Sequence, residues 1–555
     1  MEEFRERIIE FLKKETKLEN IQLEVPPNSE MGDFAFPCFT LSKEWKKPPN
    51  QIAEELSKKF SPDKFISGIK VAGPYLNFFV SREKAAKEVL LMVIDEKEKY
   101  GSSSSGKNKK IILEHTSINP NASPHVGRAR NALIGDSLAR ILRFQDYEVE
   151  VHYFVNDVGK QIAMLVLGSE GMKKITFGDL LNIYIGINRK IEENPELEKK
   201  VLELLNLLEN GDKKIRKKFE NIVDVCIKGQ QKILSELKIK YDVFDYESKY
   251  LWSDKTKESL KLLEKTGKLF VDGFNRWVLD QKGYGIGVKV PVLVLTRADG
   301  TSMYPLRDIS YNIEKASRGE NIVVLGEDHK AYQEQIAAAL KELKIKSPRA
   351  IHYSFILLDD GKMSTRKGNL VLLEDFMKEA VSKASEEIKK RYGKADEKSA
   401  KKIAYGAVKF SILRVSPEKN VVFNWQQSLS FDGETSPYIQ YAYARISSIL
   451  KKFKNKIDVK KIDLSLLNEK DEHEIISKIA SFPGVIQKAS DELRPHLIAS
   501  YTYSLAQKFN EYYHQHNILK SEKGLMEARI ILITAVRHVI KNGLDLLGID
   551  VLEKM

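Results

Sequence analysis

The chain has little cysteine and no long apolar run, and each absence excludes a class of protein. Only two of its 555 residues are cysteine, Cys38 and Cys226, which excludes a disulfide framework and a cysteine-rich zinc site. No uncharged apolar run approaches the roughly 20 residues that a helix needs to cross a bilayer. Residues 1–14 form a charged amphipathic pattern and not a signal peptide. We therefore expect a cytoplasmic protein with no membrane partner.

The composition is that of an ordinary globular protein with an excess of positive charge. Hydrophobic residues make up 42% and charged residues 30% of the chain. Lysine and arginine exceed the acids by 13, with a pI near 9.1. This balance favours a polyanionic partner, although solvated lysine faces produce the same excess. The length predicts about three or four domains.

The most informative stretch is residues 110–145. An apolar run ends at Glu114, a loop rich in asparagine and proline follows, and HVGR at 125–128 opens a helical pattern. Apolar residues then recur at three- and four-residue intervals and share one helix face, at Leu133, Ile134, Leu138, Ile141 and Leu142. With the apolar run at 149–155, the stretch predicts a strand, a helix and a second strand, as in a βαβ unit.

The predicted helix start at HVGR suits an anion. Unpaired backbone N–H groups and the helix dipole attract phosphate there, and Gly127 lets a ligand approach the backbone closely. His125 and Arg128 add side-chain donors. None of these residues is a nucleophile, so catalysis would consist of stabilising charge on a phosphoryl group. The alternative is an ordinary helix start with a surface histidine and arginine.

A second stretch, DDGKMSTRKGN at 359–369, follows another apolar run. It carries three cations between two glycines, which suits a polyphosphate clamp, although a solvated basic loop has the same composition. Together, HVGR and KMSTR resemble the HIGH and KMSKS signatures of the class I aminoacyl-tRNA synthetases. Arg128 stands in place of the second histidine and Thr365 in place of the second lysine. Lys362 and Arg366 are therefore our candidates for contact with pyrophosphate.

This resemblance implies a Rossmann-like α/β catalytic domain that binds ATP, with Mg²⁺ on the phosphates and no metal held by the protein itself. The implied catalytic residues are His125, Gly127, Arg128, Lys362, Ser364 and Arg366. The implied ATP contacts are Asn121, His125, Gly127, Arg128, Lys362, Met363 and Ser364.

Residues 1–105 are predicted to form a separate α+β domain, with 101–110 (GSSSSGKNKK) as a flexible linker. Residues 31–43 and 72–80 resemble segments of the N-terminal domain of the arginyl-tRNA synthetases. In that family the domain contacts the tRNA elbow, so Asn77 and Phe79 are candidates for binding an unpaired base. A strand with a buried phenylalanine is the alternative.

The catalytic domain is predicted over 106–410, with a helical insertion at about 165–285. After the insertion, Tyr304 and Asp308 lie four residues apart on a predicted helix, and Asp328 and His329 follow a predicted strand. A guanidinium needs carboxylates and neutral acceptors in fixed positions.

Several acidic and polar residues match those with which the arginyl-tRNA synthetases hold arginine. Tyr304 and Asp308 are assigned to the guanidinium end, Ser117 and Asn119 to the ammonium end, and Glu114 to either end. Asp328 and His329 complete the set of candidate arginine contacts.

Residues 411–555 are predicted to form a helical bundle that resembles the DALR anticodon-binding domain. Ser436 is the expected N-cap of a helix on which Tyr438, Tyr441 and Arg445 share a face. Aromatic residues interleaved with basic ones suit anticodon bases, although an aromatic stripe is also typical of a core.

The resemblance implies a monomeric enzyme that ligates L-arginine to tRNA(Arg), with ATP as the other substrate. Two alternatives remain: an adenylate-forming ligase that uses no tRNA, and a non-catalytic RNA-binding paralogue. The first would not need two terminal RNA-binding modules, and the second would be expected to lose the KMSTR loop or the acidic pocket residues.

Overall fold

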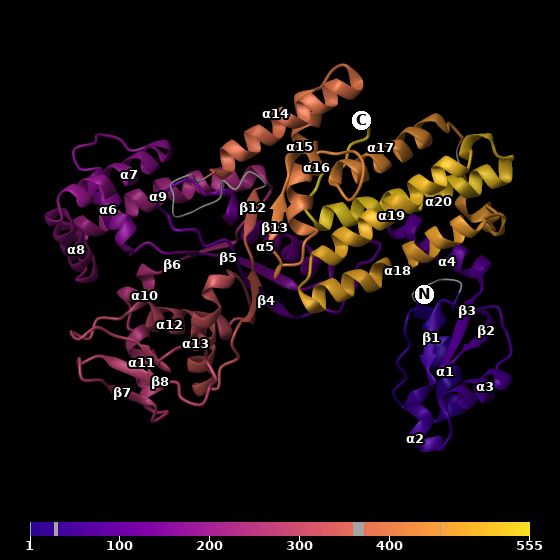
Figure 1. Cartoon of the computed structure of the whole chain (residues 1–555), viewed down its shortest axis with the longest axis horizontal. Helices are drawn as coiled ribbons and strands as arrows, with labels where there is room; N and C mark the ends of the chain where they lie inside the picture. The colour runs from indigo at the N-terminus through magenta and orange to yellow at the C-terminus, as the bar shows by residue number, and fades with distance from the viewer. Residues whose placement is uncertain (1, 27–30, 359–370, 456, 555) are drawn as a thin grey trace.

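The structure is a computed structural model that describes residues 2–26, 31–358, 371–455 and 457–554. A parallel sheet lies at the centre of the molecule (Figure 1). The N-terminal domain and a C-terminal helical bundle lie on one side of the molecule, and the helices of 160–342 lie on the other. No described helix is long and apolar enough to cross a membrane. Cys38 and Cys226 are both free and buried.

The central sheet has five strands, all parallel, and the predicted Rossmann-like core is confirmed. The chain enters at the middle strand, adds two strands on one side, and then returns to add two on the other. A topological switch point therefore lies between β4 and β10, where open α/β sheets bind ligands. In spatial order the strands are β11 (Arg349–Tyr353), β10 (Glu320–Gly326), β4 (Lys110–Glu114), β5 (Glu148–Val155) and β6 (Val243–Tyr246).

Helix α5 (Val126–Phe144) follows β4 and packs on this sheet through the predicted face. Leu133, Ile134, Leu138, Ile141 and Leu142 are all at most 2% exposed. Because their burial removes most of the apolar surface of the helix from water, it fixes the direction of α5 and the position of its N-terminus.

The insertion is not purely helical, because strands interrupt its second half. Four helices follow β5, and the chain then returns to the sheet as β6, so the prediction of a helical insertion up to about 285 is wrong. Strand β6 has only four residues, VFDY, too few to show a strand period. The four helices are α6 (Lys160–Gly168), α7 (Phe177–Glu193), α8 (Glu196–Glu209) and α9 (Lys213–Glu236).

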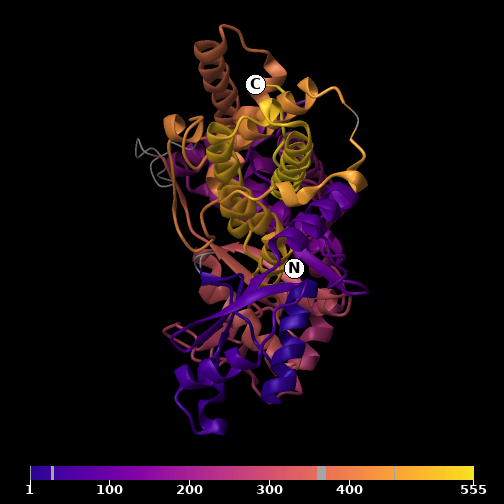
Figure 2. The ribbon, with the colours of Figure 1, turned by 90° about the vertical axis from the view of Figure 1, so that its right-hand side faces the viewer.

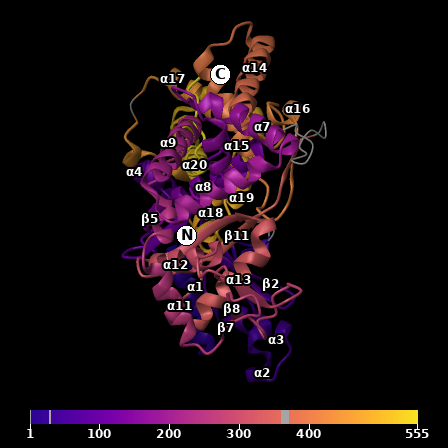
Figure 3. The ribbon, with the colours of Figure 1, turned by 90° about the vertical axis from the view of Figure 1, so that its left-hand side faces the viewer.

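A second unit follows β6 and packs around its own hydrophobic cluster, which includes Leu279, Leu293, Leu306, Ile336 and Leu340. Its antiparallel sheet covers α12 and α13. In Figures 1 and 3 this unit lies below the sheet, and α7 to α9 lie above it. Its elements are α10 (Ser248–Leu251), α11 (Lys255–Glu264), β7 (Leu269–Val271), β8 (Trp277–Asp280), β9 (Val292–Val294), α12 (Tyr304–Ala316) and α13 (Lys330–Glu342).

The N-terminal domain is α+β, as predicted. Strands β1 (Phe34–Pro37), β3 (Tyr75–Val80) and β2 (Ile66–Ala72) form an antiparallel sheet in that order. Helices α1 (Glu2–Thr16), α2 (Ser42–Trp45) and α3 (Pro49–Lys59) accompany it. Phe4, Phe36 and Phe78 are at most 1% exposed in its core.

The expected flexible linker at 101–110 is instead a packed loop, and this prediction is wrong. Helix α4 (Arg82–Glu96) leaves the N-terminal domain and runs along the C-terminal bundle (Figure 2). Gly101 and Gly106 are buried. The Gln145 side chain donates to Gly101 O at 3.2 Å, and Gly106 N donates to Gln145 O at 2.8 Å. The two glycines therefore serve close packing in this loop.

Residues 411–555 are mainly helical, as predicted, and a small parallel pair is formed by β12 (Ile356–Leu358) and β13 (Val421–Phe423). Thr435, not Ser436, is the N-cap of α17, since its hydroxyl accepts from Tyr438 N at 3.2 Å. The helices are α14 (Leu373–Tyr392), α15 (Glu397–Leu413), α16 (Trp425–Ser428), α17 (Ser436–Lys452), α18 (Lys470–Glu492), α19 (His496–Gln515) and α20 (Lys523–Leu546).

Candidate active site

The HVGR turn lies at the carboxyl end of β4, at the switch point of the sheet. His125 is the N-cap residue of α5 and is half-buried. Burial, reinforced by the charge of Arg128, lowers the pKa of His125 to about 4. His125 is therefore neutral at pH 7, and its Nδ1 has no hydrogen-bond partner among the described residues. It can act as a neutral hydrogen-bond donor to a phosphate, beside the cationic Arg128 and the open helix end.

The KMSTR residues Lys362, Met363, Ser364 and Arg366 lie outside the described residues, so their roles remain predictions. The residues that follow them are placed against HVGR. Val126 N donates to Val371 O at 2.9 Å, and Leu373 N donates to Pro124 O at 2.8 Å. The segment that carries KMSTR therefore ends at the turn that carries HVGR.

The loop between β4 and α5 begins with two residues in the left-handed region, Thr116 (φ +75°) and Ser117 (φ +42°). Such strain persists only where the surroundings hold it. Here Asn131 of α5 accepts from Thr116 N at 2.7 Å and donates to Val324 O at 2.9 Å. One asparagine thus ties the loop to both α5 and β10, and Ser117 is held at the edge of the sheet.

Asn119 and Asn121 are joined to the insertion. Both amides donate to Oε1 of Gln161 in α6, at 3.2 and 3.0 Å. The buried Gln230 of α9 donates to Asn119 O at 3.1 Å. Neither glutamine could be identified from the sequence, because nothing in a helical pattern shows which polar side chain will face a distant loop.

Asp308 is a carboxylate without a cation. Burial raises its pKa to about 7, the Tyr332 hydroxyl lowers it, Glu247 and Glu114 raise it, and Arg307 lowers it. Within the described part of the chain, no basic side chain forms an ion pair with Asp308. Tyr304 lies one helical turn earlier and is 52% exposed. A substrate guanidinium would supply the missing charge.

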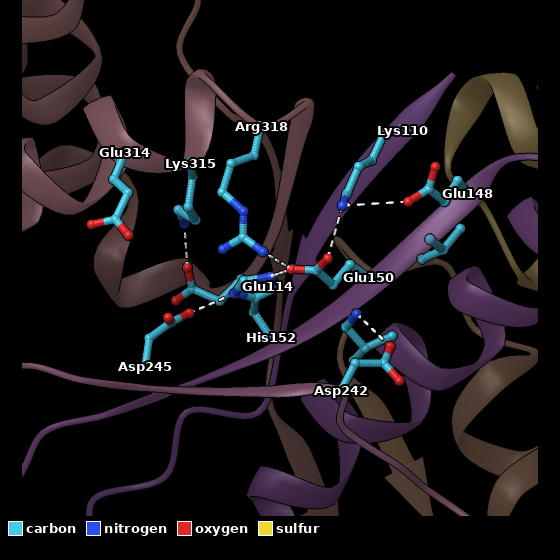
Figure 4. A network of polar contacts seen from close by, with 12 residues as sticks. Lys110, Glu114, Glu148, Glu150, His152, Asp242, Asp245, Glu314, Lys315 and Arg318 are labelled. Carbon is cyan, nitrogen blue, oxygen red and sulfur yellow. Dashed lines mark hydrogen bonds and ion pairs between the residues drawn. The ribbon is translucent and has the colours of Figure 1, made fainter. Parts of the chain in front are cut away.

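Glu114, in contrast, already has a partner. Its Oε2 lies 2.5 Å from Nζ of Lys315, and both side chains are buried (Figure 4). Beside this pair, His152 lies between Asp245 (Nδ1 to Oδ2, 2.5 Å) and Glu150 (Nε2 to Oε1, 2.8 Å). Burial would raise the pKa of Asp245, but hydrogen bonds from His152 and Tyr311 leave it lowered. A substrate group that contacts Glu114 would therefore have to share it with Lys315.

Asp328 and His329 lie at the carboxyl end of β10, in a short 3₁₀ turn (Glu327–His329) before α13. Both side chains are about half exposed, and Nε2 of His329 lies 3.7 Å from Oδ2 of Asp328. They are close enough to the switch point to stay candidates for substrate contact.

Of the two N-terminal tRNA candidates, only Phe79 reaches a cavity. Asn77 is 2% exposed in the middle of the sheet. Phe79 is half-buried and lines a cavity of about 780 Å³ between the N-terminal sheet and α18, with Arg82 and His473. A contact between Asn77 and RNA would first require its side chain to be uncovered.

The three candidates in α17 are half-buried and engaged with other helices. The Arg445 guanidinium lies 4.7 Å from the ring centroids of both Tyr441 and Tyr513, and it donates to Asn510 at 2.6 Å. The Tyr438 ring lies 5.6 Å from that of Tyr503. They form a row of aromatic rings and a cation on α17 and α19, open on one side.

Arg130, which no sequence pattern singles out, is fully buried in α5. Its guanidinium donates to Ser354 O at 2.6 Å and to Ser416 O at 2.9 Å. It therefore joins the HVGR helix to the residues that precede β12 and β13. Burial lowers its pKa to about 10, so it remains charged.

This fold and site define a class I aminoacyl-tRNA synthetase: residues 89–425 match the family model described as "tRNA synthetases class I (R), catalytic domain". Residues 2–80 match "Arginyl tRNA synthetase N terminal domain", and residues 439–555 match "DALR anticodon binding domain". The chain belongs to the arginyl-tRNA synthetase family.

Relatives of full length agree. The arginine–tRNA ligase of Methanocaldococcus jannaschii is 40% identical, with 96% of this chain and 95% of the relative covered. That of Methanococcus aeolicus is 38% identical, with 97% and 96% covered. The solved arginyl-tRNA synthetase of Thermus thermophilus superposes with a TM-score of 0.84 at 26% identity, with 99% of both chains covered.

Proposed function

We propose that the chain ligates L-arginine to tRNA(Arg) in two steps, through an arginyl-adenylate. The observation that carries this proposal is Asp308, which forms no ion pair with the basic side chains that the structure describes and lies on the same helix as the exposed Tyr304. Cations would bind Asp308, and a planar guanidinium would also stack on Tyr304. Glutamate or an aliphatic side chain would leave this carboxylate without a partner.

In the first step, the arginine carboxylate attacks the α-phosphorus of ATP, and the bond to pyrophosphate breaks. His125, Arg128 and the first N–H groups of α5 stabilise the charge on the pentacoordinate phosphorus. Lys362, Ser364 and Arg366 are assigned to the leaving pyrophosphate. Mg²⁺ enters with the ATP phosphates as part of the substrate, and no residue is assigned to hold it.

In the second step, the 2′-hydroxyl of the terminal adenosine attacks the arginyl carbonyl and releases AMP. Ser117 and Asn119 are assigned to the arginine ammonium, with Glu114 nearby. Phe79, Asn77 and the row Tyr438, Tyr441 and Arg445 are assigned to tRNA. We further propose that the enzyme works in the cytoplasm as a monomer.

The test is charging of unfractionated tRNA with each of the twenty amino acids and ATP, beside pyrophosphate exchange with and without tRNA. We expect charging with arginine alone. Asp308→Asn should raise the KM for arginine about 100-fold, because a charge-assisted contact to the guanidinium is lost. Asp254→Asn, which alters an exposed acid paired only with Lys257, is the control. Charging with another amino acid would refute the roles of Tyr304 and Asp308.

A further inference from the structure

Tyr332 contacts both residues that are assigned to the guanidinium. It lies in α13, and its hydroxyl donates to Oδ2 of Asp308 in α12. Its ring centroid lies 5.2 Å from that of Tyr304, with the rings tilted by 47°. One side chain from a neighbouring helix therefore holds the carboxylate and supports the aromatic ring.

The hydrogen bond restricts how Asp308 can meet a ligand. A carboxylate with one oxygen engaged cannot rotate freely, and its other oxygen remains an acceptor in a defined direction. Burial and the nearby Asp308 charge raise the pKa of Tyr332 well above its usual value. The hydroxyl is consequently a donor, never a phenolate, over the whole working range of pH.

We propose that Tyr332 is a positioning residue that makes the pocket selective for a charged guanidinium over a neutral group of the same shape. This inference rests on the proposed function, since it concerns the same arginine pocket. By donating to Asp308, Tyr332 favours the carboxylate form, which accepts from N–H groups. A protonated Asp308 would instead donate one hydrogen bond, as a neutral ureido oxygen requires.

The charged groups that face Asp308 explain why this one hydroxyl decides the protonation state. Glu247 and Glu114 raise the pKa of Asp308, and Arg307 and Tyr332 lower it. Arg307 is itself paired with Glu247, at 2.6 Å from Nε to Oε1. Loss of the Tyr332 hydroxyl would leave burial opposed mainly by a cation that is already engaged, so we expect the pKa of Asp308 to rise further.

Tyr332→Phe tests this proposal, because it removes the hydroxyl and keeps the ring against Tyr304. Tyr284→Phe is the matched control: Tyr284 donates to Glu342, at the other end of α13. Both variants and the wild type are assayed by tRNA charging over a range of pH. L-Citrulline, in which a neutral ureido group replaces the guanidinium, serves as a competitor.

We expect Tyr332→Phe to raise the KM for arginine about tenfold at pH 7, with kcat and the KM for ATP within about twofold of wild type. The ratio of the citrulline inhibition constant to the arginine KM should fall about tenfold. Arginine binds the deprotonated Asp308, so kcat/KM falls as the pH drops through the pKa of this residue. In the variant this limb should move to higher pH, and Tyr284→Phe should match the wild type.

Three results would count against the proposal. The proposal about Tyr332 is overturned if Tyr332→Phe leaves both the arginine KM and the ratio of the citrulline inhibition constant to that KM unchanged. Charging of arginine by the wild type would in that case still support the proposed function. The proposal is also overturned if Tyr332→Phe and Tyr284→Phe raise every KM equally, since that result indicates general loosening of α13. If the wild type does not charge arginine, the proposed function fails first.

Discussion

Burial acts in opposite directions on the two titratable side chains at the centre of the site. It lowers the pKa of His125 to about 4 and raises that of Asp308 to about 7. His125 is therefore a neutral donor at pH 7, and the positive charge beside the phosphates comes from Arg128. At pH 7 the Asp308 carboxyl is close to the midpoint of its titration. A bound cation would lower the pKa of Asp308, so arginine binding should release protons near pH 7.

His125→Ala should slow adenylate formation by raising its activation free energy by about 2 to 4 kcal/mol, as for other lost transition-state donors. His125→Gln should retain more activity, because an amide N–H can replace the neutral imidazole donor. Pyrophosphate exchange with saturating arginine measures both. Because the imidazole already carries no charge above about pH 4, kcat should show no limb near pH 6 that depends on His125. Such a limb, absent in the glutamine variant, would show that the imidazolium is the working form.

For individual residues, the sequence indicated which side chains suit the chemistry, but it did not indicate which side chains they contact. HVGR, Tyr304 and Asp308 could be chosen because their chemistry suits phosphate and guanidinium. Lys315, Tyr332 and Gln161 could not, since each acts through a contact with a residue distant in sequence. Such contacts depend on tertiary packing and leave no local pattern.

Long elements with a repeated apolar pattern could be predicted from the sequence, and short elements could not. The apolar face of α5 from Leu133 to Leu142 repeats over about three turns and could be read directly, as could the βαβ unit. Strand β6 and the hairpins β7 to β9 have three or four residues each, below the length at which alternation is informative. The return of the chain to the sheet at β6 was therefore missed.

Arg130 offers a test of how α5 is joined to the second signature segment. Arg130→Met should destabilise the catalytic domain by about 3 kcal/mol, because carbonyls of Ser354, Phe355 and Ser416 lose a buried charged donor. Since β12 follows Ser354 and Phe355 and leads to the KMSTR segment, the KM for ATP should rise more than the KM for arginine. Urea unfolding and pyrophosphate exchange measure the two effects.

Arg140→Met is the control on the same helix, since Arg140 pairs with Asp136 at a partly exposed position and should cost below about 1 kcal/mol. Equal destabilisation by the two substitutions would mean that the Arg130 contacts contribute nothing beyond a surface ion pair.

At the scale of the whole molecule, the C-terminal bundle packs against both the segment that follows α4 and helix α5 of the catalytic domain. Tyr100 donates to Ile479 O in α18 at 3.1 Å, and Asn542 of α20 donates to Tyr100 O at 3.1 Å. The buried Lys409 donates to Gly548 O at 2.5 Å, beside α5. The expected linker at 101–110 is thus a junction between the catalytic domain and the bundle. Composition alone predicted flexibility, because glycine and serine are equally common in linkers and in loops that other elements approach closely.

Gly101 gives this junction a measurable test. Its φ is +95°, and an added Cβ would lie 2.7 Å from Ile486 and 3.0 Å from Phe482, both in α18. Gly171 has a similar φ of +83°, but nothing lies within 4 Å of the added atom. Alanine at either site should cost about 1 kcal/mol of backbone strain. Gly101→Ala should cost about 1 to 2 kcal/mol more, because α18 must shift.

Calorimetric melting of the full chain should show the difference as a lower first transition in Gly101→Ala, since loosening α18 frees the bundle from the catalytic domain before the rest unfolds. Gly171→Ala should shift the curve less and leave its shape unchanged. If the two variants melt alike, the close approach of α18 contributes little, and 101–110 behaves energetically as the linker that its composition suggested.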